Sequence, residues 1–260
     1  YPAYKTGVLL SGARVEPLPL REENDFLPEF GAINRAALAR ARMLFLNYPN
    51  NPTGACAGAD FYREAVRFAV KNNLWVAHDA AYSEIYFKKP SPSILSVPGA
   101  GGTAVEFYSL SKTYCMTGWR LGWLIGNSRA VQALGRLKEH IDSGQFNAIQ
   151  ETAVFCLENH GALVKPIRET FRKRTEFFAG ELKKAGWHLI EPEAAFFVWA
   201  RPPVSRSSLA VVYEILEKTS VLASPGSGFG ASGEGFVRFS LCASDARIKE
   251  AARRLSGMKW

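Results

Sequence analysis

Residues 105–120 read Val-Glu-Phe-Tyr-Ser-Leu-Ser-Lys-Thr-Tyr-Cys-Met-Thr-Gly-Trp-Arg, a strand-like stretch that runs into a lysine flanked by hydroxyl side chains. Arg120 follows Lys112 by eight residues. A lysine amine can form an imine with an aldehyde, and serine hydroxyls together with a guanidinium suit a dianionic phosphate. The combination indicates one ligand that carries both a carbonyl group and a phosphate. Taken alone, the pattern also fits a surface lysine and an arginine on a solvated face.

Two further apolar stretches end in polar residues. Residues 43–47 (Met-Leu-Phe-Leu-Asn) run into residues 48–54 (Tyr-Pro-Asn-Asn-Pro-Thr-Gly), and residues 74–78 (Leu-Trp-Val-Ala-His) run into residues 79–82 (Asp-Ala-Ala-Tyr). In a wound α/β sheet, ligands bind outside the carboxyl ends of parallel strands. We therefore expect the three strand ends to face one crevice. Pyridoxal 5′-phosphate is a ligand that carries both required groups.

The order and spacing of these segments resemble the fold-type I pyridoxal-phosphate aminotransferases of class I and II. The matching stretches are Asn50-Asn51-Pro52-Thr53-Gly54, Asp79-Ala80-Ala81-Tyr82, Ser109-Leu110-Ser111-Lys112 with Arg120, and Phe236-Val237-Arg238-Phe239-Ser240. Residues 78–87, 116–122 and 141–146 are similar to the branch of LL-diaminopimelate and succinyl-diaminopimelate aminotransferases. The resemblance spans the chain and implies an α/β fold. Its large cofactor domain would have a mainly parallel sheet flanked by helices, followed by a smaller C-terminal α+β domain.

Periodicity gives a similar organisation. Residues 58–73 carry apolar side chains on one helical stripe between two apolar strands, which is typical of a parallel strand-helix-strand unit. Further strands are expected at residues 105–110, 121–125, 196–200 and 236–241, and further helices at residues 128–140, 149–159, 162–185 and 209–219, with Ser244 capping a last helix. We therefore expect a large cofactor-binding domain at residues 1–160. An interdomain helix and a small α+β domain would occupy residues 161–260.

Length and composition are those of an ordinary soluble protein. With 260 residues, 47% of them apolar, the chain can bury a substantial core. Its four cysteines are scattered singly and no histidine has metal-ligand spacing, so neither a metal site nor a disulfide framework is indicated. No apolar stretch is long enough to span a bilayer, and we expect a cytoplasmic protein with no membrane partner. The net charge of +8 is spread over helix-like segments, which favours a solvated basic face over nucleic-acid binding.

The chain begins with Tyr1-Pro2-Ala3-Tyr4 rather than methionine, and we interpret it as truncated at its N-terminus. The resemblance implies that a preceding segment supplies a backbone loop for the phosphate. It also implies a homodimer, in which the partner subunit adds an aromatic hydroxyl to the phosphate. Tyr1 would stack on the cofactor ring, although a terminal residue is easily frayed.

The resemblance assigns roles to the residues that would face the cofactor ring. Asp79 would keep the pyridinium nitrogen protonated, which makes the ring a better electron sink. Its alternative role is that of a helix N-cap. Tyr82 would donate to the phenolic oxygen of the ring, or else be a core aromatic. Asn51, biased toward an extended backbone by Pro52, would face the same oxygen and the substrate, or else simply form a turn.

Further roles concern the phosphate, the aldehyde and the substrate. Ser109, Ser111 and Arg120 are assigned to the phosphate, because a guanidinium gives a charged, bidentate contact. Lys112 is assigned to the aldehyde and to proton transfer. Arg238 alternates with apolar residues in a strand, where a charge demands an anionic partner. By resemblance that partner is the α-carboxylate of the substrate, and the alternative is a structural ion pair.

The predicted activity is therefore a ping-pong transamination. The amino donor would be LL-diaminopimelate or its succinylated form, and the acceptor a 2-oxo acid such as 2-oxoglutarate, as in lysine biosynthesis. A carbon–sulfur lyase of the same fold would use the same residues. Two further alternatives are the cofactor-sensing module of a transcription regulator and a chain that binds the cofactor weakly or not at all. Residues that set side-chain specificity are expected partly in the absent segment and in the partner subunit.

Overall fold

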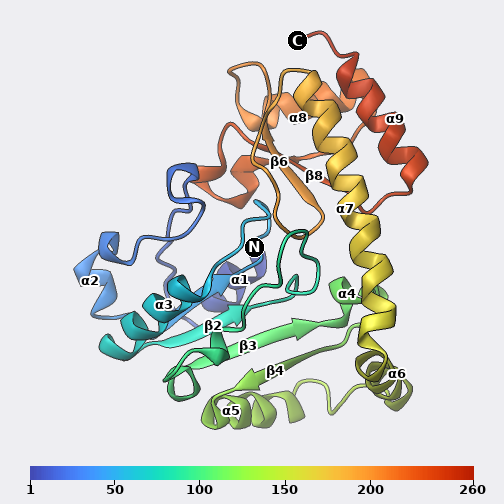
Figure 1. The fold of residues 1–260 in the computed structure, drawn as a ribbon. Coiled ribbons are helices and arrows are strands. Elements are labelled where there is room, and N and C mark those ends of the chain that lie inside the picture. The colour runs from blue at the N-terminus through green and yellow to red at the C-terminus, as the bar shows by residue number, and fades with distance from the viewer. The chain divides into compact units, whose positions relative to one another are not determined.

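The computed structural model describes residues 1 and 3–260 (Figure 1). The chain forms two compact units. We call residues 29–49 with 56–168 the parallel-sheet unit, and residues 1–28 with 50–55 and 169–260 the antiparallel-sheet unit. Among the described residues, no helix is long and apolar enough to cross a membrane.

The units do not follow the domain division expected at residue 160. They divide between Arg168 and Glu169, inside helix α7 (His160–Lys184), and the N-terminal 28 residues belong to the same unit as the C-terminal part of the chain. Helix α7 supplies Val164 to the core of one unit and Leu182 to the core of the other. A boundary inside a continuous helix has no Gly- or Pro-rich linker that the sequence could reveal. The assignment of functional domains to residues 1–160 and 161–260 stays a prediction.

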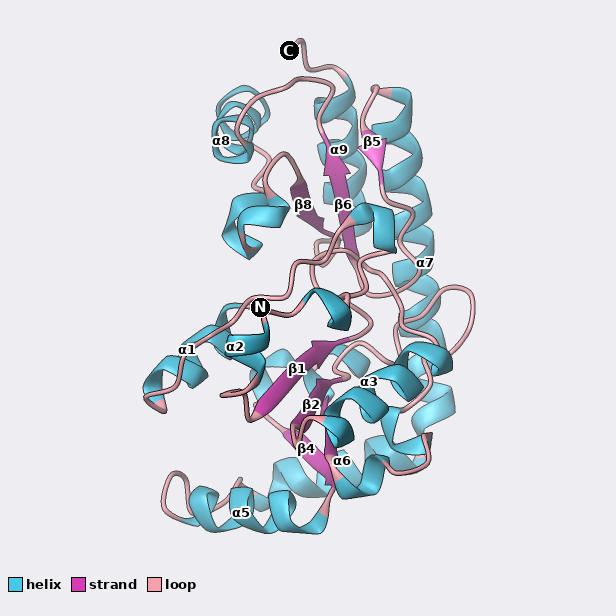
Figure 2. Ribbon diagram, turned by 90° about the vertical axis from the view of Figure 1, so that its left-hand side faces the viewer, coloured by secondary structure: helices cyan, strands magenta, loops and turns pink.

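A four-stranded sheet organises the parallel-sheet unit. Its strands, in spatial order, are β1 (Met43–Asn47), β2 (Trp75–Asp79), β3 (Ala104–Ser109) and β4 (Gly122–Gly126). The first three strands are parallel, and β4 runs antiparallel to β3. Helix α3 (Ala59–Lys71) connects β1 to β2 (Figure 2). It buries an apolar stripe that includes Phe61, Ala65 and Ala69, spaced four residues apart. The predicted mainly parallel, helix-flanked sheet is confirmed.

Short and long helices complete this unit. They are α2 (Arg35–Leu38), α4 (Leu110–Thr113), α5 (Ser128–Glu139), α6 (Asn147–Glu158) and the first part of α7. Leu110 and Tyr114, at the two ends of α4, share a small core with Ala153, Cys156 and Val164 from α6 and α7. The short helix that carries Lys112 is therefore held by packing on both sides of the lysine.

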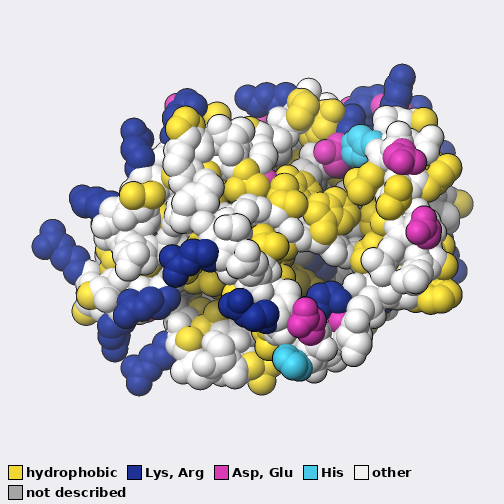
Figure 3. Space-filling view, turned by 90° about the horizontal axis from the view of Figure 1, so that it is seen from below, with side chains coloured by type: hydrophobic (Ala, Val, Ile, Leu, Met, Phe, Trp, Pro, Cys, Tyr) yellow, Lys and Arg dark blue, Asp and Glu magenta, His cyan; other side chains and the backbone are white. Residues whose placement is uncertain are grey.

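Several large apolar side chains of this unit are exposed. Leu137, Ile141, Phe146 and Phe155 along the α5–α6 segment are examples. Figure 3 views the molecule from the side on which α5 lies in Figure 1, and it shows hydrophobic side chains in the middle of that face. In this chain these side chains contribute little to the buried core.

The antiparallel-sheet unit has a second four-stranded sheet. Its spatial order is β5 (His188–Leu189), β6 (Phe197–Arg201), β8 (Val237–Ser240) and β7 (Ser224–Pro225), with antiparallel pairing throughout. Helix α8 (Ser208–Thr219), helix α9 (Asp245–Ser256) and the last part of α7 bury one core with this sheet, which includes Leu182, Val198, Ile215 and Leu255. The predicted α+β architecture is confirmed.

The strands and helices expected from periodicity are present, with small shifts at their ends. Helix α1 (Pro2–Leu10) was not predicted, because its apolar residues do not form one buried stripe and Leu9 and Leu10 are exposed. Ser244 stands at the N-cap position of α9, as expected, but its side chain makes no capping hydrogen bond.

Truncation of a core leucine tests this packing. Leu182 is fully buried, whereas Leu209 on α8 is half exposed. Leu182→Ala should lower the free energy of unfolding by about 2–5 kcal/mol, because it leaves a cavity, and Leu209→Ala should lower it by less than about 1 kcal/mol. Urea denaturation followed by far-UV circular dichroism measures both. Similar losses in the two variants would contradict the core described here.

Candidate active site

The carboxyl ends of three parallel strands meet at one edge of the sheet in the parallel-sheet unit. The register pairs Asn47 of β1 with Asp79 of β2, and Asp79 with Phe107 of β3. Ser109 ends β3 two residues later, and α4 with Lys112 follows directly. The structure therefore brings the carboxylate and the amine to the ends of adjacent strands, as the sequence predicted.

Asp79 is fixed at the strand edge by its backbone and by its side chain. Its carbonyl oxygen accepts a hydrogen bond of 2.9 Å from the amide of Asn47. Its carboxylate oxygen Oδ1 accepts one of 3.1 Å from the backbone N–H of Ala81. A turn at residues 81–84, not a helix, follows the strand, so Asp79 is not a helix N-cap. The carboxylate is half-buried, which leaves it accessible to a ligand.

Helix α4 positions the lysine and two predicted phosphate ligands. Ser109 is the N-cap of this helix, and its Oγ accepts a 3.1 Å hydrogen bond from the backbone N–H of Ser111. A hydroxyl that accepts one hydrogen bond still has its own proton to donate. Ser111 is buried, and its carbonyl oxygen accepts a 3.0 Å bond from the hydroxyl of Thr117. Lys112 is half-buried.

Arg120 lies at the end of that turn. Its φ of 54° is left-handed, and its guanidinium donates from Nη1 to the carbonyl oxygen of Thr117 over 2.7 Å. Thr117 therefore contacts both Arg120 and Ser111, and it ties the arginine to the segment of the lysine. Arg120 is exposed, and its guanidinium carries further N–H donors.

Two predicted aromatic residues differ in burial. Tyr82 is buried, at 6% exposure, within the turn that follows Asp79. Burial is compatible both with a contact to a ring oxygen and with a core aromatic. Tyr1 is 59% exposed, and its ring lies edge-on to Tyr4 with centroids 5.7 Å apart. Stacking of Tyr1 on a cofactor stays a prediction.

Arg238 and Asn51 form a second group, in the antiparallel-sheet unit. The guanidinium donates from Nη1 to Oδ1 of Asn51 over 2.8 Å and from Nη2 to the hydroxyl of Ser224 over 3.2 Å. It also lies over the rings of Phe197 and Phe229, 4.6 and 4.8 Å from their centroids. These contacts fix the plane of the guanidinium through neutral groups.

The turn that carries Asn51 is held within the same unit. The hydroxyl of Thr53 donates to Oδ1 of Asn50 over 2.9 Å, and the backbone N–H of Gly54 donates to the carbonyl oxygen of Asn50 over 2.9 Å. Gly54 has a φ of +73°, and a Cβ there would lie 3.0 Å from the carbonyl oxygen of Ala194. The predicted turn is present, and it aims the Asn51 amide at Arg238.

The residues of the strand edge fit pyridoxal 5′-phosphate. The carboxylate of Asp79 suits a protonated ring nitrogen, and the amine of Lys112 suits an aldehyde. The hydroxyls of Ser109 and Ser111 and the guanidinium of Arg120 suit a phosphate dianion. Asp79 ends β2, and Ser109, Ser111 and Lys112 lie at or directly after the end of β3, so these groups start from adjacent strand ends. A metal is not part of this set, and within residues 1 and 3–260 no group of three His, Cys, Asp or Glu is placed to hold one.

A buried polar cluster directly behind this edge was not predicted. His78 and Glu106 are paired residues of β2 and β3, each about 1% exposed, with His78 Nδ1 2.8 Å from Glu106 Oε1. Burial by itself raises the pKa of Glu106, but hydrogen bonds from His78 and Ser93 outweigh it and hold the pKa below its usual value. The sequence feature that could have revealed this cluster is a charged or polar residue inside each apolar strand: His78, one residue before Asp79, and Glu106, three residues before Ser109.

A second network ties the lysine segment to α7. The hydroxyl of Tyr114 lies 2.9 Å from Nδ1 of His160, whose Nε2 lies 3.1 Å from a carboxylate oxygen of Glu84. Arg168 donates to the backbone and to the side chain of Glu84 and lies over the ring of Tyr86, 3.7 Å from its centroid. These contacts hold the segment after Asp79 and the segment after Lys112 against the same helix.

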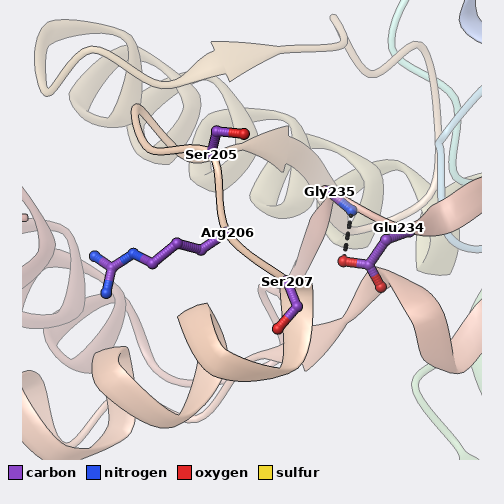
Figure 4. A pocket seen from close by; sticks show the side chains of 5 residues that line it. All are labelled: Ser205, Arg206, Ser207, Glu234 and Gly235. Atoms are coloured by element: carbon purple, nitrogen blue, oxygen red, sulfur yellow. Dashed lines mark hydrogen bonds between the residues drawn. The ribbon is translucent and has the colours of Figure 1, made fainter.

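No predicted site residue lines the surface pocket in Figure 4, which belongs to the antiparallel-sheet unit. Its lining residues are Ser205, Arg206, Ser207, Glu234 and Gly235. The carboxylate of Glu234 accepts hydrogen bonds from the backbone N–H groups of Ser208 and Gly235, which lower its pKa. Arg206 points away from this carboxylate (Figure 4). Glu234 thus caps the N-terminus of α8.

A family model and curated proteins match this chain over nearly its whole length. The model of the family "Aminotransferase class I and II" matches residues 1–255. LL-diaminopimelate aminotransferase of Nitratidesulfovibrio vulgaris is 45% identical over 258 residues, covering 98% of this chain and 66% of that protein. The same enzyme of Natranaerobius thermophilus is 43% identical over 256 residues, with the same shares covered. The chain thus spans about two thirds of the length of these relatives.

Solved structures also match nearly the whole chain. A substrate-bound structure of BacF from Bacillus subtilis has a TM-score of 0.95 at 35% identity, covering 98% of this chain and 66% of that one. A probable N-succinyldiaminopimelate aminotransferase from Thermus thermophilus has a TM-score of 0.92 at 35% identity, covering 98% and 68%.

The buried carboxylate gives a pH-dependent stability. Glu106→Gln should lower the free energy of unfolding by about 2 kcal/mol at neutral pH, because hydrogen bonds to an ionised group are lost. The folded pKa of Glu106 is lowered, so its stabilisation is present above the ordinary carboxyl pKa and is lost as the pH falls through the folded value. Denaturant titrations from neutral to acidic pH measure the difference. Glu217→Gln, at an exposed position of α8, is the control, and a pH-independent difference for Glu106→Gln would refute the prediction.

Proposed function

Because the chain belongs to the class I and II aminotransferase family, we propose that the protein carrying it moves an amino group from an amino acid to a 2-oxo acid with pyridoxal 5′-phosphate as cofactor. The observation that carries the proposal is the register that sets Asp79 and the lysine-bearing helix at adjacent strand ends. Relatives named LL-diaminopimelate aminotransferases at 43–45% identity support diaminopimelate, or its succinylated form, as the amino donor. A 2-oxo acid such as 2-oxoglutarate is the acceptor. A homodimeric state and a cytoplasmic location belong to the same proposal.

Each residue of the strand edge has one task in this proposal. Lys112 holds the aldehyde carbon, Asp79 holds the ring nitrogen, and Ser109, Ser111 and Arg120 hold the phosphate. When bound, the cofactor supplies a ring that spreads negative charge away from the α-carbon of the substrate.

Proton transfer is assigned to Lys112. After the amino group of the substrate displaces it from the aldehyde carbon, the freed Nζ would accept the α-proton of the amino acid and later donate a proton to the former aldehyde carbon. A half-buried amine is accessible to a bound substrate yet shielded on one side from water. The packing of Leu110 and Tyr114 on both sides of the lysine supports this role, because it limits the motion of the short helix.

Substrate orientation is assigned to Arg238 and Asn51. A guanidinium held flat by two aromatic rings presents its N–H groups in one plane, which suits bidentate binding of an α-carboxylate. Asn51 accepts from Arg238 through Oδ1, and its side chain also carries an amide nitrogen, which is a donor. We assign that donor to the phenolic oxygen of the ring, together with the hydroxyl of Tyr82.

Spectroscopy and product analysis test the activity. The protein is loaded with pyridoxal 5′-phosphate and mixed with LL-diaminopimelate, and the loss of its visible absorption band is followed before and after 2-oxoglutarate is added. We expect the band to disappear and then return with formation of glutamate. Release of pyruvate and ammonia from a sulfur amino acid, without glutamate formation, would establish the carbon–sulfur lyase instead.

Replacement of the lysine should abolish this activity. Lys112→Ala should lower kcat by at least about 10³-fold, because the proton-transfer group is lost, and it should remove trapping of the cofactor by borohydride. Lys138→Ala is the matched control, because Lys138 is a partly exposed lysine of the same unit that pairs with Asp142. Undiminished activity and trapping in Lys112→Ala would exclude Lys112 from both roles.

Replacement of Arg238 should act on substrate binding. Arg238→Gln should raise KM for the amino donor about 10- to 100-fold, the equivalent of losing charged hydrogen bonds to a carboxylate. Arg201→Gln is the control, because Arg201 also lies in the antiparallel sheet and over an aromatic ring, that of Phe236. An equal effect of both substitutions on KM would contradict the assignment of Arg238.

A further inference from the structure

Five side chains of the parallel-sheet unit form one hydrogen-bonded group around the buried carboxylate of Glu106. We call them the Glu106 cluster: Tyr62, His78, Ser93, Glu106 and Tyr108. His78 Nδ1 lies 2.8 Å from Glu106 Oε1, and the hydroxyl of Tyr108 donates to Oε2 over 2.7 Å. The hydroxyl of Ser93 also donates to Oε2, and the hydroxyl of Tyr62 lies 3.1 Å from His78 Nε2. One carboxylate thus holds groups from β2, from β3 and from the loop between them.

The cluster lies next to the candidate site in the sequence but on the other face of the sheet. His78 immediately precedes Asp79, and Tyr108 immediately precedes Ser109. Successive residues of a strand point to opposite faces, so the cluster does not reach a ligand held by Asp79 and Lys112. Any influence on that ligand has to pass through the backbone of β2 and β3.

We propose that the Glu106 cluster is a positioning device, which fixes the carboxyl end of β2 against that of β3 and so sets Asp79 relative to Lys112. The importance of this spacing rests on the proposed function, because the two residues would hold opposite parts of one ring. Glu106 contacts His78, the residue before Asp79 on β2, and Tyr108, the residue before Ser109 on β3. The backbone hydrogen bond from Ala80 N–H to the Phe107 carbonyl oxygen, 2.9 Å long, closes the strand pair at that edge.

The chemistry of the cluster supports positioning over simple packing. A buried charged carboxylate stabilises a fold little compared with an apolar residue of the same size, because its desolvation is costly. Hydrogen bonds have strict distances and directions, so they fix the lateral position of two strands more precisely than apolar contacts do. Glu106 accepts four of them, counting the backbone N–H of Ile94 at 3.3 Å.

Two substitutions of His78 separate its two contacts. In His78→Asn, the amide nitrogen stands near the place of Nδ1 and still donates to Glu106, but the contact with Tyr62 is lost. In His78→Gln, the longer side chain reaches toward Tyr62 and loses the donor to Glu106. Tyr62→Phe removes only the hydroxyl that contacts His78 Nε2. It is the matched control for the loss of one buried hydrogen bond.

Hydrogen exchange of two backbone amides provides a readout that needs no cofactor. Ala80 N–H bonds across β2 and β3 at the functional end, and Val76 N–H bonds to Thr103 at the other end of the same strand pair. His78→Gln should raise the exchange rate of Ala80 about tenfold relative to Val76. His78→Asn and Tyr62→Phe should leave this ratio within about twofold. An equal rise in the exchange rates of both amides in His78→Gln would overturn the proposal. The cluster would then stabilise the whole β2–β3 pair and not its functional end.

Affinity for pyridoxal 5′-phosphate gives the second readout, measured by quenching of tryptophan fluorescence. We expect Kd to rise about tenfold in His78→Gln and to change less than about twofold in Tyr62→Phe. A locally faster Ala80 amide with unchanged Kd would overturn the link between the cluster and the site. If the unsubstituted protein binds no cofactor, the proposed function fails, whereas the exchange ratio still decides whether the cluster fixes the strand ends.

Discussion

Parallel pairing of β1, β2 and β3 is the constraint on which the candidate site depends. Because Asn47, Asp79 and Phe107 are in register, three strand ends stop at one edge. Parallel strands leave their carboxyl ends on the same side, so each chain segment that follows them starts from there. An antiparallel partner at β2 would have carried Asp79 and Lys112 to opposite edges of the sheet.

The sequence predicted this edge well, since each strand is a short apolar run followed directly by a polar residue. Asp79, Ser109 and Lys112 could therefore be placed without coordinates. The contact between Arg238 and Asn51 could not, because it joins residues far apart in the chain and no local pattern encodes it. Only the resemblance to a known family suggested that the two would act together.

Some features of the fold are only partly visible in the sequence pattern. His78 and Glu106 interrupt apolar strands, but periodicity alone does not reveal that the two side chains face each other across β2 and β3. Helix α7 was predicted as a long helix, yet the point at which its residues pass from one core to the other depends on tertiary packing. The N-cap position of Ser244 was predictable, whereas the absence of its side-chain hydrogen bond was not.

The course of the chain between the two units has a practical consequence. The backbone passes from one unit to the other after Pro28, Pro49, Ala55 and Arg168. Neither unit is therefore a single uninterrupted piece of the sequence, and neither can be excised by cutting the gene at one place. Asn51 lies in residues 50–55, which belong to the same unit as Arg238, whereas the residues on both sides of this segment belong to the other unit. Any attempt to study one half in isolation would therefore require a circularly permuted or spliced chain.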